Sequence, residues 1–249
     1  MILRRLTVNL RTQNWTAIAV EFVLVVLGVF FGILAANWNL ERVERQETRR
    51  LLSQLDTELS LFITSLEKIE QYYGVSDRYA TRALAGWKGV ASVSDGEFII
   101  AAYQASQING IGQNGSVWAQ IFGAENLRNV DDLALRSSLS QLMTFDYALV
   151  SLAAAASRYR EEVRKIIPDR QQRAIRARCG DVQKPSGIEL PATCDLKLPA
   201  AEAARTAAAL RARPDLVREL NWHQAGIATQ LQNIRALRDN AAEVGRGID

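Results

Sequence analysis

Few side chains in this sequence have the types and spacing that chemistry requires. His223 is the only histidine, and the two cysteines form no C-x-x-C pair. Two cysteines do not complete a zinc site, so we expect no metal. His223 also falls on the apolar face of a helical segment, beside Trp222. We therefore interpret it as a hydrogen-bonded core histidine rather than a catalytic base.

Motifs that would support catalysis are missing from the sequence. It contains no P-loop, no G-x-S-x-G and no G-x-G-x-x-G that opens a helix after a strand. The adjacent acids Glu161 and Glu162 lie among arginines and are interpreted as a solvated pair. The sequence thus predicts a protein that is not an enzyme and carries no cofactor.

Cys179 and Cys194 enclose a stretch that contains two glycines and two prolines. This composition predicts a non-helical connection over residues 179–199. Two cysteines in such a loop suit one disulfide if the compartment oxidises thiols. The alternative is two reduced thiols in a cytosolic domain.

Length and charge narrow the classes of partner. With 249 residues, 48% of them hydrophobic, the chain has ample material for a core. Its net charge is +3, of which residues 1–40 hold +2 (Arg4, Arg5 and Arg11 against Glu21). The rest of the chain is close to neutral, so it presents no positive field for nucleic acid. We interpret its many arginines as solvated helix faces.

One segment has the properties of a membrane-spanning helix. From Trp15 to Trp38 the chain runs 24 residues with Glu21 as its only charge. Such a helix would be roughly 36 Å long, enough for a hydrocarbon core of about 30 Å. Trp15 and Trp38 fit the two interfaces as anchors. A cleaved signal peptide is the competing interpretation, but this run is longer than a signal peptide's apolar region and lacks an A-x-A site.

The predicted transmembrane helix has one distinctive face. Glu21, Gly28, Gly32, Ala35 and Asn39 lie within about 60° of one another at 100° per residue. The two glycines form a G-x-x-x-G pattern, which lets a second helix approach closely in lipid. We expect a homo-oligomer or a partner membrane protein at this face. Glu21 lies near the membrane edge, where it either reaches headgroups or contacts a partner helix.

The count of basic residues in the two flanks does not decide the orientation of this helix, but the lengths of the segments on either side favour one. Residues 1–14 contain three arginines and no acid, whereas residues 41–50 mix four arginines with three glutamates. A short basic tail is easily retained in the cytoplasm, while a long domain can be exported largely regardless of its charge. We expect a cytoplasmic tail over 1–14, a bacterial inner-membrane span over 15–38 and a periplasmic domain over 39–249.

Three stretches of the exported part carry apolar positions at spacings of three and four residues, as in coiled coils and bundles. The first comprises Leu52, Leu55, Leu59, Phe62, Leu66, Ile69 and Tyr73. The second comprises Leu135, Ser138, Leu142, Phe145, Leu149, Leu152, Ala156, Tyr159, Val163 and Ile166. The third comprises Leu216, Leu220, His223, Ile227, Gln230, Ile234, Leu237 and Ala241.

Helix-stop and cap residues complete the predicted fold. With no Pro or Gly between Gly32 and Gly74, the membrane helix is expected to continue outward and to end at Gly74; Pro168 closes the second stretch. Shorter helices are predicted at 76–88, 95–107 and 116–127, with Ser76-Asp77, Ser94-Asp95 and Ser116 as N-caps and a loop at 109–115. No sustained strand alternation occurs. The fold class is therefore all-α: an N-terminal transmembrane helix that continues into a long helix, followed by an antiparallel helical bundle.

Aromatic residues gather in the region of the short helices. They are Tyr72, Tyr73, Trp87, Tyr103, Trp118 and Phe122. They either line a ligand pocket between helices or form part of the core.

The segment Val20 to Asn39, VEFVLVVLGVFFGILAANWN, resembles the opening of an uncharacterised family of bacterial single-pass membrane proteins. Members typically read G-E-I-x-L-V-V-x-G-I, then an apolar run, then N-x-W-N-E. Here Val20 replaces the usual glycine, and Leu40 intervenes before Glu41. A weaker match covers SVWAQI from Ser116 and ENLRNV from Glu125. The resemblance implies a membrane anchor and a helical body, and it supplies no catalytic residue.

Two functional hypotheses follow from these features. The first is a membrane-anchored helical protein that binds or scaffolds a partner. The second is a periplasmic ligand-sensing bundle that signals through a separate protein, because the chain has no signalling domain of its own.

Overall fold

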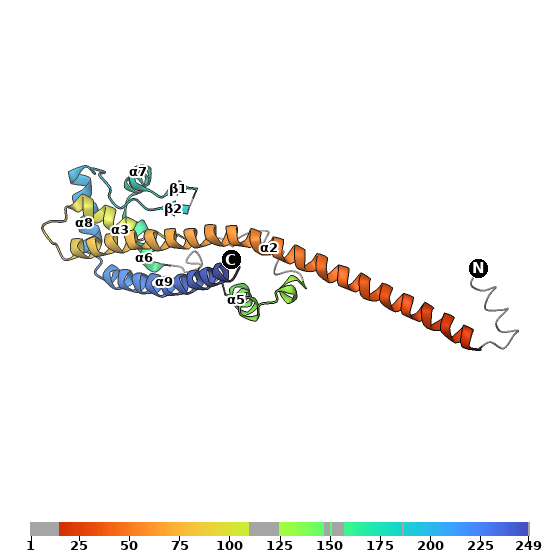
Figure 1. Ribbon diagram of the computed structural model, residues 1–249. Helices are drawn as coiled ribbons and strands as arrows, with labels where there is room; N and C mark the ends of the chain where they lie inside the picture. The colour runs from red at the N-terminus through yellow and green to blue at the C-terminus, as the bar shows by residue number, and fades with distance from the viewer. Residues whose placement is uncertain (1–14, 110–124, 147–149, 151–156, 186, 249) are drawn as a thin grey trace.

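Helix α2 is the axis of the molecule. In the computed structural model, which describes residues 15–109, 125–146, 150, 157–185 and 187–248, α2 runs without interruption from Trp15 to Trp87 (Figure 1). Its 73 residues make it about 110 Å long. Every residue from 22 to 47 is exposed, and burial begins at Thr48. The first part of α2 therefore projects from the rest of the protein, and the second part lies within it.

The buried part of α2 follows the predicted apolar spacing. Its buried face comprises Leu51, Leu55, Leu59, Phe62, Leu66, Ile69, Tyr72 and Tyr73, with Leu52 partly buried. The prediction of a packed helix over this stretch is confirmed. Spacings of three and four residues keep these side chains on one side of a 3.6-residue helix.

The prediction that Gly74 ends this helix is wrong. The helix continues for thirteen further residues to Trp87, and Ser76, the predicted N-cap, lies buried inside it. Glycine in a helix interior costs about 1 kcal/mol relative to alanine, and burial of the following apolar turns outweighs that cost. The helix ends at Trp87, and Gly89, with a φ of 69°, takes the left-handed cap conformation two residues later. The N–H of Val90 bonds the carbonyl of Ala85 at 3.1 Å, as in a Schellman cap.

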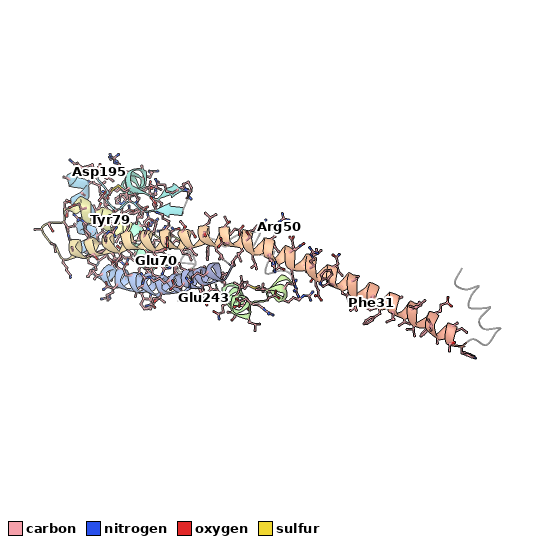
Figure 2. All side chains as sticks on the ribbon, viewed as in Figure 1. Phe31, Arg50, Glu70, Tyr79, Asp195 and Glu243 are labelled. Carbon is pink, nitrogen blue, oxygen red and sulfur yellow. A yellow bond between two sulfur atoms is a disulfide. The ribbon has the colours of Figure 1, made fainter. Side chains whose placement is uncertain are left out.

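Helix α9, Asp215–Ile248, is the second long element and lies beside the buried part of α2 (Figure 1). The predicted third stretch is confirmed: all its positions are buried except Gln230, which is partly buried. The two helices run antiparallel, and Glu70 on α2 forms ion pairs with Arg235 at 2.6 Å and Arg238 at 3.0 Å (Figure 2 labels Glu70). The all-α bundle class is thereby confirmed.

The predicted long helix over 135–166 is wrong. The chain forms α5 over Leu133–Thr144 and α6 over Arg158–Ile166, and Phe145 already has an extended ψ of 130°. Asp132 and Ser157 cap the two helices: each side-chain oxygen accepts a backbone N–H of the first turn. The predicted positions Leu149, Leu152 and Ala156 lie outside the described residues. A short 3-10 helix, η1 over Glu125–Asn129, stands where the predicted helix 116–127 would end.

Helix α3, Asp95–Gln104, forms the centre of the core. Ser94 and Glu97 make a reciprocal capping box, which confirms the predicted start of this helix. All residues from Phe98 to Gln104 are buried. A helix that is buried on every side requires neighbours all round, and α3 packs against α2, α6 and α8.

The remaining elements lie after Pro168. Helix α7, Asp169–Cys179, and helix α8, Ala200–Arg211, flank the predicted non-helical connection. That connection contains a small antiparallel hairpin, β1 over Val182–Lys184 and β2 over Gly187–Glu189, which the sequence did not predict. In Figure 1 the hairpin and α9 lie on opposite sides of α2. Lys68 on α2 holds β2 through an ion pair with Glu189 at 3.2 Å.

Candidate functional site

The aromatic residues predicted as a pocket or core lie in the core where the structure describes them. Tyr72, Tyr73 and Tyr103 are each exposed by 1% or less. Trp87 is partly buried and packs edge-to-face on Phe98 at 4.9 Å between ring centroids. The other two predicted members, Trp118 and Phe122, lie outside the described residues.

The tyrosines of α2 hold two connecting segments against the helix. The hydroxyl of Tyr73 donates to the carbonyl of Asn109 at 2.5 Å and accepts the N–H of Asn109 at 2.8 Å. The hydroxyl of Tyr72 donates to Oδ1 of Asp181 at 3.0 Å. Burial raises the pKa of both phenols, so they stay neutral hydrogen-bonding groups. Their role is to position the segments after α3 and α7.

His223 lies in the core and is hydrogen-bonded, as predicted from the sequence. Its Nδ1 lies 2.9 Å from the hydroxyl of Ser157, and its ring stacks on Tyr159 at 5.8 Å. Burial lowers the pKa of His223 to about 4, with the charge of Arg160 acting in the same direction. The hydroxyl of Ser157 also accepts the N–H of Arg160, so it caps α6 while it bonds the imidazole.

This Ser157–His223 pair lacks the further groups that a nucleophilic site requires. Nε2 of His223 has no hydrogen-bond partner, so in the described part of the chain no carboxylate orients the ring. Among the described residues, no group of three His, Cys, Asp or Glu side chains could hold a metal ion.

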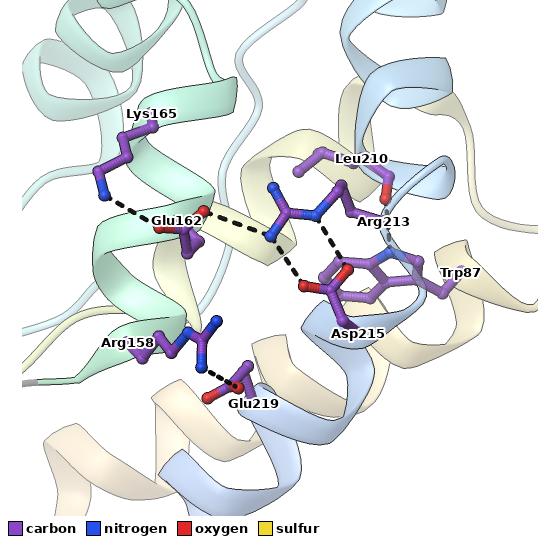
Figure 3. Close-up of polar contacts among 8 residues, drawn as sticks. All are labelled: Trp87, Arg158, Glu162, Lys165, Leu210, Arg213, Asp215 and Glu219. Atoms are coloured by element: carbon purple, nitrogen blue, oxygen red, sulfur yellow. Dashed lines mark hydrogen bonds and ion pairs between the residues drawn. The ribbon is translucent and has the colours of Figure 1, made fainter.

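A polar network ties α6, α8 and α9 together at the end of the bundle (Figure 3). Arg213 makes a two-pronged pair with Asp215, at 2.9 and 2.7 Å, and contacts Glu162 at 3.3 Å. Glu162 also pairs with Lys165 at 2.9 Å. Glu162 is therefore a bridging residue, and its interpretation as a solvated acid is wrong.

The disulfide between Cys179 and Cys194 closes this part of the fold. The structure joins the two cysteines, with 5.5 Å between their Cα atoms. It links the end of α7 to the irregular segment before α8. The carbonyl of Cys179 accepts a hydrogen bond from the buried amide of Gln104 at 2.5 Å, so the linked end of α7 also contacts α3.

Sequence reasoning missed a group of three arginines at the C-terminal end of α3. Arg160 and Arg164 on α6 are partly buried, and Arg176 on α7 is exposed. Their guanidinium groups contact Gln107 or Tyr103, and we call these three residues the arginine cluster. Their interpretation as solvated faces is wrong for Arg160 and Arg164. Two residues of the buried face of α6, Tyr159 and Val163, each precede one of them in sequence. Their position directly after a buried residue is the sequence feature that could have identified Arg160 and Arg164.

The apolar part of α2 carries the residues predicted to contact a membrane. Trp15 and Trp38 are exposed by 69% and 67%. A Cβ atom added at Gly28 or Gly32 would meet nothing within 4 Å, so the glycine face is open. Ala35 and Asn39 are exposed and Glu21 is partly buried. By length and composition, α2 is a helix that could cross a membrane, and none of its apolar window is buried.

No family model, curated protein or solved structure matches the chain. The resemblance of residues 20–39 to a family of bacterial membrane proteins stays a prediction.

Proposed function

We propose that this protein is anchored in the bacterial inner membrane by residues 15–38 of α2 and that its helical bundle lies in the periplasm. The observation that carries the proposal is the exposure of twelve large apolar side chains between Val20 and Leu34. In water their exposure would cost on the order of 20 kcal/mol relative to burial. In a hydrocarbon layer that cost disappears, and Trp15 and Trp38 would meet the two interfaces.

Because α2 is continuous, it would connect the membrane segment rigidly to the bundle. Nine residues, 39–47, separate Trp38 from the first buried residue, Thr48, and all nine are helical and exposed. They amount to about 14 Å of exposed helix, along which Glu44 accepts a hydrogen bond from Asn129 of η1 at 3.5 Å. A helix without Pro or Gly transmits orientation far better than a flexible linker does. The bundle would thus stand at a defined height above the headgroups.

A reporter fusion tests this placement. We expect alkaline phosphatase, fused after Asp249 of the full chain, to be active in cells, because that enzyme requires an oxidising compartment. The same fusion should float with vesicles in a sucrose gradient. As a control, a fusion with Leu27→Arg and Val26→Arg should lose membrane association, since each central arginine costs about 3 kcal/mol of insertion. Activity confined to a cytosolic reporter at the same position would reject the orientation.

We further propose that the protein acts without catalysis, by holding a partner at the membrane surface. The open face of Gly28 and Gly32 allows a second helix to approach α2 closely in lipid. A second copy of this chain or another membrane protein would pack there. The bundle would then present its surface in a fixed array to a periplasmic partner.

Cysteine crosslinking in native membranes tests the packing face. We expect full-length Gly28→Cys to give a crosslinked dimer or heterodimer under mild oxidation, because small residues bring the helix backbones together. Phe30→Cys is the matched control: it lies about 200° around the helix from position 28 and should crosslink much less. Equal crosslinking at both positions, or none at either, would contradict a specific face.

A specific observation favours the alternative function, a ligand-sensing bundle. The hydroxyl groups of Tyr72 and Tyr73 on α2 donate hydrogen bonds to Asp181 and Asn109, which follow α7 and α3 in the chain. A ligand that moved the segments after α7 and α3 would act on the helix that enters the membrane. The signal would then pass to a separate protein.

A further inference from the structure

Two guanidinium groups of α6 lie side by side on the segment that follows α3. Nη1 of Arg160 donates to the carbonyl of Ser106 at 2.6 Å and to Oε1 of Gln107 at 3.3 Å. Arg164 uses the same two residues: its Nε donates to the hydroxyl of Ser106 at 3.3 Å and its Nη2 to Oε1 of Gln107 at 2.8 Å. Two positive groups therefore share one amide oxygen.

A third guanidinium reaches the same place from α7. Nη1 of Arg176 donates to the hydroxyl of Tyr103 at 3.2 Å. The guanidinium carbon of Arg164 lies 4.7 Å from the centroid of the Tyr103 ring. The three members of the arginine cluster thus converge on the C-terminal end of α3, and Arg176, with 46% of its side chain exposed, opens the cluster to solvent.

The negative charge nearby is smaller than the positive charge. Against the three guanidinium groups stand Asp181, which interacts with Arg160 and Arg164, and about half a negative charge at the C-terminal end of α3. Asp181 acts on Arg160 and Arg164 through space, but in the described part of the chain it forms no ion pair with them. Asp169 lies 3.8 Å from Arg176 and is already paired with Arg173. Roughly one positive charge in the cluster is left without a counterpart.

Partial burial makes this imbalance costly. Burial lowers the pKa of Arg160 and of Arg164, and for Arg164 the neighbouring charge of Arg160 adds to the effect. Partly buried like charges are normally separated or paired, because removing them from water is unfavourable. Charged groups perturbed in this way mark candidate functional sites, and a bound anion would supply the missing charge here.

We propose that the arginine cluster binds an oxyanion, the carboxylate or phosphate group of a small molecule. Arginine suits this chemistry because its planar fork offers two parallel N–H donors to such a group. The bonds described above use Nη1 of Arg160 and Nε and Nη2 of Arg164, which leaves Nη2 of Arg160 and Nη1 of Arg164 as donors for the ligand. Oxyanion binding at the cluster depends neither on the membrane placement nor on the packing face of α2. If those proposals failed, oxyanion binding could still be tested, and if oxyanion binding failed, they would be unaffected.

The test uses the purified full-length chain in detergent, titrated with inorganic phosphate or with succinate at constant ionic strength set by sodium chloride. Calorimetry should show saturable binding of at least one of the two probes. Binding of phosphate alone assigns phosphate groups to the site, binding of succinate alone assigns carboxylates, and binding of both leaves the shared oxyanion chemistry in place.

Variants on one helix separate the site from general charge effects. Arg176→Gln should weaken binding at least about tenfold, the factor that one hydrogen bond to a charged group contributes. Arg170→Gln, six residues earlier on α7, is the matched control: its side chain is 79% exposed and pairs with Glu202, not with Asp169. It removes the same charge and should bind as the unaltered chain does. Arg164→Lys keeps its charge but loses the fork, and it should also weaken binding. Absence of binding by both probes, or equal losses in Arg170→Gln and Arg176→Gln, overturns the proposal.

Discussion

Replacing Cys179 and Cys194 together by serine is expected to lower the free energy of unfolding by about 3 kcal/mol, because the disulfide closes a loop of fifteen residues in the unfolded chain. For a chain of this size such a loss corresponds to a fall in melting temperature of about 6–12 °C. The effect is large because the closed loop contains few packed side chains of its own. Its only described secondary structure is the hairpin β1–β2, whose two strands have three residues each.

The linked segment also bears on the packing of α2. Tyr79 of α2 donates its hydroxyl hydrogen to the carbonyl of Pro191 at 3.0 Å, three residues before Cys194. Tyr72 contacts Asp181, two residues after Cys179. Loosening the loop would therefore release two contacts on the long helix, so we expect the fall in stability to be accompanied by faster proteolysis between residues 180 and 199.

Thermal unfolding followed by circular dichroism, with and without reductant, measures the effect. Reductant should lower the melting temperature of the unaltered full-length chain by a similar amount, whereas it should leave the double serine variant unchanged. A melting temperature that does not respond to reductant in the unaltered chain contradicts the prediction. A chain that depends on this bond for a large fraction of its stability folds best in an oxidising compartment, as the proposed periplasmic placement requires.

The long helices α2 and α9 could be predicted from sequence because their apolar spacing is regular over many turns. Each presents one buried face, and a regular spacing identifies that face directly. The start of α3 could be predicted for a similar reason, because a serine before a helix supplies a local N-cap. The structure adds Glu97, which completes a capping box with Ser94. Residue spacing is therefore enough to predict a helix or a cap when the residues that form it are close together in sequence.

The interruption between α5 and α6 could not be predicted by the same rule. Residues 135–166 keep helical spacing across the interruption, yet Phe145 leaves the helix and Ser157 starts a new one. The cap at Ser157 is tied to a partner 66 residues away, because its hydroxyl also bonds His223. Contacts distant in sequence decided the break, and periodicity carries no information about them.

The arginine cluster illustrates the same limit for the candidate site. Arg160 and Arg164 point into the molecule only because the end of α3 offers them a carbonyl, a hydroxyl and an amide oxygen. From sequence alone they are two of many arginines on helices. Arg160 and Arg164 are partly buried, unlike the exposed arginines of other helices, because α6 packs against α3.

Alanine substitutions at Gly86 and Gly74 of α2 are expected to change the stability of the protein in opposite directions. The contrast tests whether α2 ends at Trp87 or at Gly74. Gly86→Ala should destabilise the protein by about 1–3 kcal/mol, the usual cost of overpacking. The added Cβ would overlap the ring of Phe98, which is fully buried and held edge-to-face by Trp87. The ring has no free space to move into without disturbing that pair, so the better helix propensity of alanine cannot compensate.

Gly74→Ala, twelve residues earlier in the same helix, is the matched control and should stabilise the protein by about 0.5–1 kcal/mol. Its Cβ would meet only the end of the Arg78 side chain at 4.0 Å, and position 74 has an ordinary helical backbone. Were Gly74 a left-handed cap, the same alanine would cost about 1–2 kcal/mol. Urea unfolding of the two variants in parallel measures the change in the free energy of unfolding for each. A gain at position 74 with a loss at position 86 supports one helix to Trp87. A loss at both positions would instead support a helix that ends at Gly74.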